Sequence, residues 1–352
     1  MDEGQVRRRG CLYNRLLMRT STAVALLSCA ALIPAAPAAD SSLLGLAPAG
    51  SDVLVGINVK QILESKLGKL ITAQVAGPGH PEFKEFVEKA GFDPLRDLDE
   101  VLIAAPAKQN PNALLLLRGH FDTAKLSQLA VAGGMKGADY HGVRILARAG
   151  QKEGFSALAV LDPSLVVGGD EAGVRAFVDR RGQGPGLSAA IAAKAGEASK
   201  ADDIWVVLHA APSAFAPGAA EGPMGGLMQS IEQATLGIKF GTDIVLSVHA
   251  VTHTAQDAEG LVGALRLFSG MAAANQKGNQ QVATMLQRLK LESEGNTAKL
   301  SLAIPEAEAE AAIRDAIAAG MQAQKQAPAP SPTSSEPSSQ DSGVVTLPAP
   351  KQ

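Results

Sequence analysis

Cysteine and aromatic residues are scarce in this sequence, and each shortage excludes classes of protein. The only two cysteines, Cys11 and Cys29, lie in an N-terminal segment that we expect to be removed. A mature chain without thiols has no disulfides, no thiolate catalysis and no cysteine–zinc site. Aromatic residues make up 3% of the chain and hydrophobic residues 46%, so the core must be aliphatic and aromatic platforms for glycans are few.

An excess of positive charge is also lacking. The formal net charge is −3, and five arginines lie before residue 20, so the remaining chain is more acidic than the whole. Nucleic-acid binding depends largely on basic side chains that displace counterions from phosphates. We therefore expect no nucleic-acid partner.

Residues 1–39 have the pattern of a secretory signal peptide. A basic stretch ending at Arg19 precedes an uncharged, mostly apolar run over 20–33, and an Ala-Pro-Ala sequence ending at Ala38 is typical of a cleavage site. We expect cleavage near Ala38 or Ala39. The mature protein is then periplasmic or extracellular.

Two alternatives for this segment stay open. The four residues ending at Cys29 resemble a lipobox, which would make the protein a lipoprotein anchored there. If it is retained, the stretch 20–39 is about long enough to span a bilayer. A membrane is an expected partner only in these two cases.

The region between this segment and the C-terminus shows a pattern that occurs twice. Strand, helix, hairpin, helix, hairpin and helix follow one another in 40–182 and again in 183–322. The order β-α-β-β-α-β within each half is that of a ferredoxin-like unit. We predict an α+β fold of two tandem ferredoxin-like units with mostly antiparallel sheets, and a disordered Pro/Ser-rich tail at 323–352.

The individual elements are expected from hydrophobic periodicity and from turn and capping residues. Predicted strands cover 52–59, 99–105, 112–119, 142–148, 155–161, 165–168, 204–210, 234–240, 244–251, 290–294 and 297–303. Predicted helices cover 60–76, 80–90, 122–132, 170–180, 255–274, 281–289 and 305–319.

Two segments of the first half resemble a known family. The run Gly-Phe-Asp-Pro-Leu-Arg-Asp-Leu-Asp-Glu-Val over 91–101, together with Leu-Val-Val-Gly-Gly-Asp over 165–170, is similar to exported bacterial proteins related to the DUF3352 class. The resemblance implies an exported, two-part protein. It supplies no catalytic residues.

Three histidines form the only candidate metal site. His249 and His253 lie four residues apart on a predicted strand, and His209 lies at the end of another strand that we expect in the same sheet. Imidazoles so placed are possible ligands of zinc or copper. However, no carboxylate follows at a typical ligand spacing, and an exposed histidine at a strand end needs no special explanation.

The stretch 211–226 is small, apolar and rich in Gly and Pro. One interpretation is a loop that replaces the first helix of the second unit. The other is a docking loop for an apolar ligand or partner. Its candidate ligand-binding residues are Phe215, Met224, Leu227 and Met228.

Other motifs have structural explanations. The globular part has no G-x-S-x-G or S-x-x-K sequence for a catalytic serine. Gly169-Asp170 lacks phosphate-loop spacing, and Asp170 is better interpreted as a helix N-cap. The acidic residues of 93–100 lack a calcium-loop register and indicate a solvated loop.

These observations favour an exported, non-enzymatic binding or interaction scaffold that needs no cofactor. An envelope protein is its expected partner. The alternative is a periplasmic carrier of a lipid or other apolar ligand, and a metal-binding protein is the third hypothesis.

Overall fold

The computed structural model of the protein describes residues 43–77, 81–107, 113–151, 154–184, 186–210, 225–275 and 280–315. The predicted signal peptide and the predicted tail lie outside these residues. The described elements up to Glu310 belong to one compact unit.

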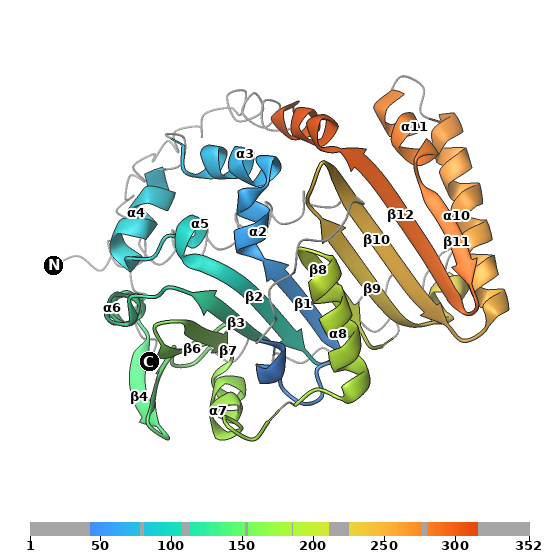
Figure 1. Cartoon of the computed structure of the whole chain (residues 1–352). Helices are drawn as coiled ribbons and strands as arrows, with labels where there is room; N and C mark the ends of the chain where they lie inside the picture. Colours follow the sequence, from blue (N-terminus) through green and yellow to red (C-terminus); the bar gives the residue numbers. More distant parts are fainter. Residues whose placement is uncertain are drawn as a thin grey trace, which may run out of the picture. The chain divides into compact units, whose positions relative to one another are not determined.

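Twelve strands form one sheet (Figure 1). In chain order they are β1 (Val53–Asn58), β2 (Leu98–Ala105), β3 (Leu114–Gly119), β4 (Lys136–Tyr140), β5 (Val143–Ala147), β6 (Ala157–Asp162), β7 (Leu165–Gly169), β8 (Ile204–Leu208), β9 (Ile231–Lys239), β10 (Asp243–Thr252), β11 (Lys290–Glu294) and β12 (Thr297–Pro305). Across the sheet the order is β11-β12-β10-β9-β8-β1-β2-β3-β7-β6-β5-β4.

The helical elements connect these strands. They are the short 3-10 helix η1 (Leu44–Leu46), α2 (Val59–Glu64), α3 (Lys66–Val75), α4 (Pro81–Ala90), α5 (Pro94–Asp97), α6 (Thr123–Ala132), α7 (Glu171–Asp179), α8 (Ala189–Ala201), α9 (Gly225–Gln229), α10 (Ala255–Asn275) and α11 (Gln280–Gln287). A further helical segment over 306–315 follows β12.

The predicted α+β class with antiparallel pairing is confirmed, but the two tandem ferredoxin-like units are not. The strand order is β1-β2-β3-β7-β6 in the first half and β8-β9-β10-β12-β11 in the second, so the halves share one topology. A ferredoxin-like unit places parallel strands around its helical crossovers. Here the connection after β1 returns to β2, which pairs antiparallel with β1 directly.

The two halves also share a sheet instead of forming one each. β1 and β8 are both first strands of their halves, and they pair antiparallel from Val53 opposite Leu208 to Ile57 opposite Ile204. A strand edge that is left unpaired in one half is thus covered by the other half, which removes two exposed edges. The predicted boundary at 182–183 therefore lies between two halves of one sheet.

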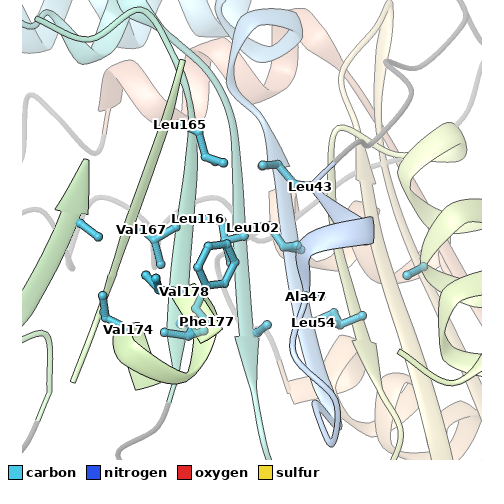
Figure 2. Packing of buried hydrophobic residues seen from close by; sticks show 14 of the residues in the cluster. Leu43, Ala47, Leu54, Leu102, Leu116, Leu165, Val167, Val174, Phe177 and Val178 are labelled. Carbon is cyan, nitrogen blue, oxygen red and sulfur yellow. The ribbon is translucent and has the colours of Figure 1, made fainter. Parts of the chain in front are cut away.

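Side chains alternate between the two faces of the sheet, and each face has its own core. On one face Leu54 and Val207 pack in a cluster with residues of η1, α7 and α8. Figure 2 shows Phe177 and Val178 of α7 lying against Leu116 and Val167 on this face. Burial of each such side chain stabilises the fold by about 1.5–3 kcal/mol.

On the opposite face two smaller cores lie near the two ends of the sheet. One joins α4 and α6 to β3, β6 and β7 and contains Phe92 and Phe121. The other joins α9 and α10 to β9, β10, β11 and β12 and contains Leu261 and Val262. The outermost helix of the second core, α10, packs on the sheet with one side and also contacts α11.

At the junction of the halves, an indole ring lies across a glycine. Gly56 of β1 is the register partner of Trp205 of β8. A Cβ atom built on Gly56 would lie 2.1 Å from the Cε2 atom of Trp205, and the Trp205 residue is 3% exposed. The absence of a side chain at Gly56 is what allows this ring to be buried.

The predicted single helix over 60–76 is two helices, α2 and α3. The Ser65 hydroxyl donates to the Ile62 carbonyl at 2.6 Å and accepts the Gly68 N–H at 2.9 Å, so this residue caps the second helix. Serine at an N-cap competes with continued helix in this way. A Cβ atom on Gly68 would lie 1.9 Å from the Ile62 oxygen, so the close approach at this break requires glycine.

Candidate interaction surface

The three predicted metal-ligating histidines are not brought together. Among the described residues, no group of three or more His, Cys, Asp or Glu side chains is placed to hold a metal ion. A bulge between Val251 and Thr252 interrupts the alternation of β10 between His249 and His253. His253 instead lies 3.6 Å from the Glu232 carboxylate.

The surroundings of His249 also oppose a bound cation. Its register partner on β12 is Lys299. Partial burial, and then the positive charges of Lys299 and Lys194, lower the pKa of His249. A site that disfavours a proton on the imidazole for these reasons also disfavours a metal cation, because the same two charges repel both.

The predicted ligand-binding residues divide into two pairs. Phe215 and Met224 lie outside the described residues. Leu227 and Met228 are half-buried residues of α9, where they pack against the core under α10. Their apolar side chains therefore belong to the interior packing of the second half.

The two acidic segments singled out in the sequence have structural roles. The Asp170 carboxylate accepts the Gly173 N–H at 2.8 Å, which confirms it as the N-cap of α7. In the acidic loop, Asp93 caps α5, and the Asp97 carboxylate is paired with the Arg96 guanidinium at 2.7 Å. These carboxylates accept local hydrogen bonds, as expected for capping residues, although the second oxygen of Asp170 is buried without a partner.

A buried cluster of charged side chains lies where β8 begins and β9 ends. The Lys239 ammonium is 2.7 Å from an Asp203 carboxylate oxygen, and the other oxygen of Asp203 accepts the Phe240 N–H at 2.8 Å. The side chains of Lys239 and Asp203 are 11% and 1% exposed. The neighbouring residue Asp202 is partly buried. Its burial is the main cause that raises its pKa from 3.8 to about 6, and the negative charge of Asp203 is the second cause.

This raised pKa predicts a pH dependence of stability. Because the folded protein holds the Asp202 proton more tightly than the unfolded chain, this group stabilises the fold below pH 4, and the contribution is lost as the pH rises through about 6. Asp202→Asn should therefore raise the free energy of unfolding by about 1–2 kcal/mol at pH 8, after allowance for solvent screening. At pH 4 it should change little. Urea titrations at both pH values measure this, and an equal effect at both would contradict the assignment.

A shallow cavity of about 180 Å³ opens between the hairpin of β4 and β5 and helix α7. The Arg175 guanidinium at its edge lies 2.7 Å from Glu171 and 4.6 Å from the ring centroid of Tyr140. These contacts occupy the Glu171 and Arg175 side chains of the cavity. Its lining residues are Lys136, Gly137, Ala138, Ile145, Ala147, Ala149, Glu171 and Arg175.

The outer face of α10 carries three large apolar side chains. Leu267 is 62% exposed, Met271 52% and Phe268 40%. Leu267 and Met271 are one turn apart and lie on the same side of the helix, with Phe268 beside them. The opposite side of α10 is already packed on the sheet through Ala258, Leu261 and Val262.

Charge is scarce along this outer face. From Gly263 to Ala274 the only charged side chain is Arg266. Its guanidinium donates at 2.6 Å to the carbonyl of Leu291 on β11, the strand under the helix. Arg266 is still exposed, but this hydrogen bond holds its guanidinium toward the sheet, and the side of α10 that carries Leu267 and Met271 is apolar. Exposed apolar surface of this kind marks interaction sites in soluble proteins.

We call Leu267, Phe268 and Met271 the α10 stripe. Sequence analysis predicted the helix over 255–274 but did not identify the stripe. The sequence did contain a sign of the stripe, because apolar residues occupy both sides of this helix, whereas an ordinary surface helix has one apolar side.

Comparisons with known proteins give the following results. No protein-family model matches the chain, and no curated protein matches its sequence. The solved structure of TP0453 in crystal form III is similar with a TM-score of 0.45 and 12% identity, covering 80% of this chain and 98% of that chain. TP0453 in crystal form I has a TM-score of 0.45 and 13% identity, with coverage of 78% and 97%. Within the described part of the chain, no helix has the length and apolarity needed to cross a membrane.

Proposed function

We propose that the chain is an exported, non-enzymatic protein of the bacterial envelope that acts as an interaction scaffold. The observation that supports this best is the α10 stripe, where three large apolar side chains are 40–62% exposed on a helix whose other side is packed. The stripe is the binding surface, and the twelve-stranded sheet is its rigid support. Export and cleavage near Ala38 or Ala39 belong to the same proposal.

The energetic argument follows from exposure. Full burial of a large apolar side chain contributes about 1.5–3 kcal/mol. Because the stripe residues are roughly half exposed in the chain alone, a partner that covers all three gains on the order of 3 kcal/mol from them. This gain contributes to a specific contact, but further contacts of the partner must offset the larger cost of association.

A second candidate function, the carriage of an apolar ligand, is favoured by the middle of the sheet. On the face that bears α6 and α10 near its ends, Val55 of β1 lies in register with Ile103 on one side and Val206 on the other. Leu115 and Leu236 extend this row, and all five side chains are half-buried. Native mass spectrometry of protein from its host envelope would show a bound lipid if this candidate is right.

The scaffold proposal is tested by polar substitution of the stripe. The variant Leu267→Ser, Phe268→Ser, Met271→Ser should remain folded with a modestly lower thermal midpoint, because these side chains are roughly half exposed and lie outside the buried cluster under α10. In envelope extracts we expect the wild-type chain to elute from size-exclusion chromatography in a complex with its partner, and the triple variant to elute without it.

The matched control is Val131→Ser, which removes another exposed apolar side chain, 49% exposed, from α6. This variant should keep the wild-type elution profile. An unchanged profile for the triple variant would refute the proposal that the stripe is the binding surface.

A further inference from the structure

Glycines lie near the α10 stripe on the exposed side of the helix, and packing within the chain does not require them. Gly263 and Gly270 are exposed, and a Cβ atom on either would have no atom within 4 Å. On Gly260 it would meet only Leu227, at 3.7 Å. Glycine inside a helix is about 1 kcal/mol less favourable than alanine. Three such residues on one exposed side therefore weaken α10 without any benefit inside the molecule.

Glycines on a helix surface allow another helix backbone to approach closely. A flat membrane surface or a small apolar ligand does not need this, whereas a second helix with protruding side chains does. The observed pattern of large and small residues, Gly260, Gly263, Leu267, Met271 and Ala274, lies along one side of α10 at spacings of three and four residues.

We infer that a second copy of this chain binds here, with the two α10 helices antiparallel about a two-fold axis at Leu267. In such a pair, residues whose numbers are equidistant from 267 face each other. Met271 of each copy then lies opposite Gly263 of the other, and Ala274 lies opposite Gly260. A surface that is complementary to itself is what an isologous dimer requires. The inference rests on the proposed role of the stripe as a binding surface.

Charge also suits a second copy. A symmetric interface brings identical side chains close to the axis, so a charged residue at its centre would repel its own copy. The centre here is Leu267, and the only nearby charge, Arg266, is directed to the Leu291 carbonyl under the helix. Glu259 lies two turns away, toward the end of the contact. Arg266 is exposed and next to the axis, and its hydrogen bond to Leu291 holds each guanidinium on the sheet side of its own helix, away from Leu267.

The size of the contact predicts a weak dimer. One pair of helices with three exposed apolar side chains on each covers less than the roughly 800 Å² per partner that a standard stable interface buries. The dimer should therefore form at high local concentration, as at an envelope surface, and dissociate on dilution.

Cysteine cross-linking tests this geometry, since the chain has no cysteine after residue 29. Purified full chains carrying Leu267→Cys should form a disulfide-linked dimer under mild oxidation, because residue 267 faces itself across the axis at a distance that a disulfide can span. Glu259→Cys, exposed on the same helix away from the axis, is the matched control. We expect about tenfold less dimer from it, and the unsubstituted chain shows any cross-link through Cys11 or Cys29.

A mixed experiment fixes the direction of the helices. Gly263→Cys and Met271→Cys, carried on chains with different tags, should cross-link to each other more than either does to itself. A preference for self-linking, or no dimer from Leu267→Cys, would overturn the inference.

The two proposals fail in different ways. If Leu267→Cys gives no dimer but the triple serine variant still loses its envelope complex, the partner is another protein and only the second-copy inference falls. If the purified chain instead sediments with phospholipid vesicles through the stripe and forms no dimer, the inference also falls. If neither the cross-link nor the complex depends on the stripe, both proposals fall.

Discussion

Trp205→Ala is expected to lower the free energy of unfolding by about 3–5 kcal/mol, as the loss of a large buried ring does. The effect should be at the upper end because Trp205 lies where β1 and β8 join the two halves of the sheet. Gly56→Ala should also destabilise, by about 1–3 kcal/mol, because its new methyl group would lie within 2.1 Å of the indole. Urea titrations followed by far-ultraviolet circular dichroism measure both.

The double variant isolates the contact itself. Once Trp205 is replaced by alanine, the methyl group of Gly56→Ala meets no ring, so its cost should nearly vanish. The two substitutions should therefore be strongly non-additive. Additive effects would show that the indole does not lie on Gly56.

Asp203→Ala is expected to cost about 3–5 kcal/mol, since it removes the carboxylate bonded to the buried Lys239 ammonium and leaves only the charge of neighbouring Asp202 near it. It also removes the acceptor of the Phe240 N–H. Adding Lys239→Met to this variant should restore much of the loss, because an apolar side chain then replaces the unpaired charge. The measurement is again the free energy of unfolding in urea at pH 7.

An exposed ion pair provides the control for this prediction. Lys299 is paired with Glu294 at the surface, and Lys299→Met should change stability by less than about 1 kcal/mol. If Asp203→Ala lowered the free energy of unfolding no more than Lys299→Met, the buried ion pair would not stabilise the start of β8 as its geometry indicates.

Periodicity was sufficient to predict most strands and helices of this protein. The hairpin strands predicted at 290–294 and 297–303 correspond to β11 and β12, and the helix predicted at 255–274 corresponds to α10 within one residue. These segments have strong alternation or helical spacing and clear turn residues such as Gly295, whose φ of 54° favours glycine. Local sequence alone determines such elements.

Besides the short helices η1, α5 and α9, two further elements were not predicted because their patterns are weak. β4 (Lys136–Tyr140) is an edge strand with four exposed residues, so no alternation of apolar residues marks it. α8 (Ala189–Ala201) buries mainly small side chains, and only Ile191 and a few alanines identify its packed side. Alanine contributes little hydrophobic contrast, so the helix was not distinguished from a linker.

The pairing of β1 with β8 could not be derived from the sequence. Alternation shows which side chains of a strand face the core, but not which edge pairs with which. Val55 and Val206 would fit the interior of two separate sheets equally well. The same limit applies to the histidines, because a bulge after Val251 has no clear local signature.

The α10 stripe is the part of the account on which the functional proposal depends. A photo-reactive amino acid placed at Leu267 in the producing cell tests it most directly, with position 131 on α6 as the equally apolar control. We predict a covalent adduct from position 267 in the envelope fraction, of twice the chain mass if the partner is a second copy, and none from position 131. The same adducts from both positions, or none from position 267, would contradict the assignment of α10 as the binding surface.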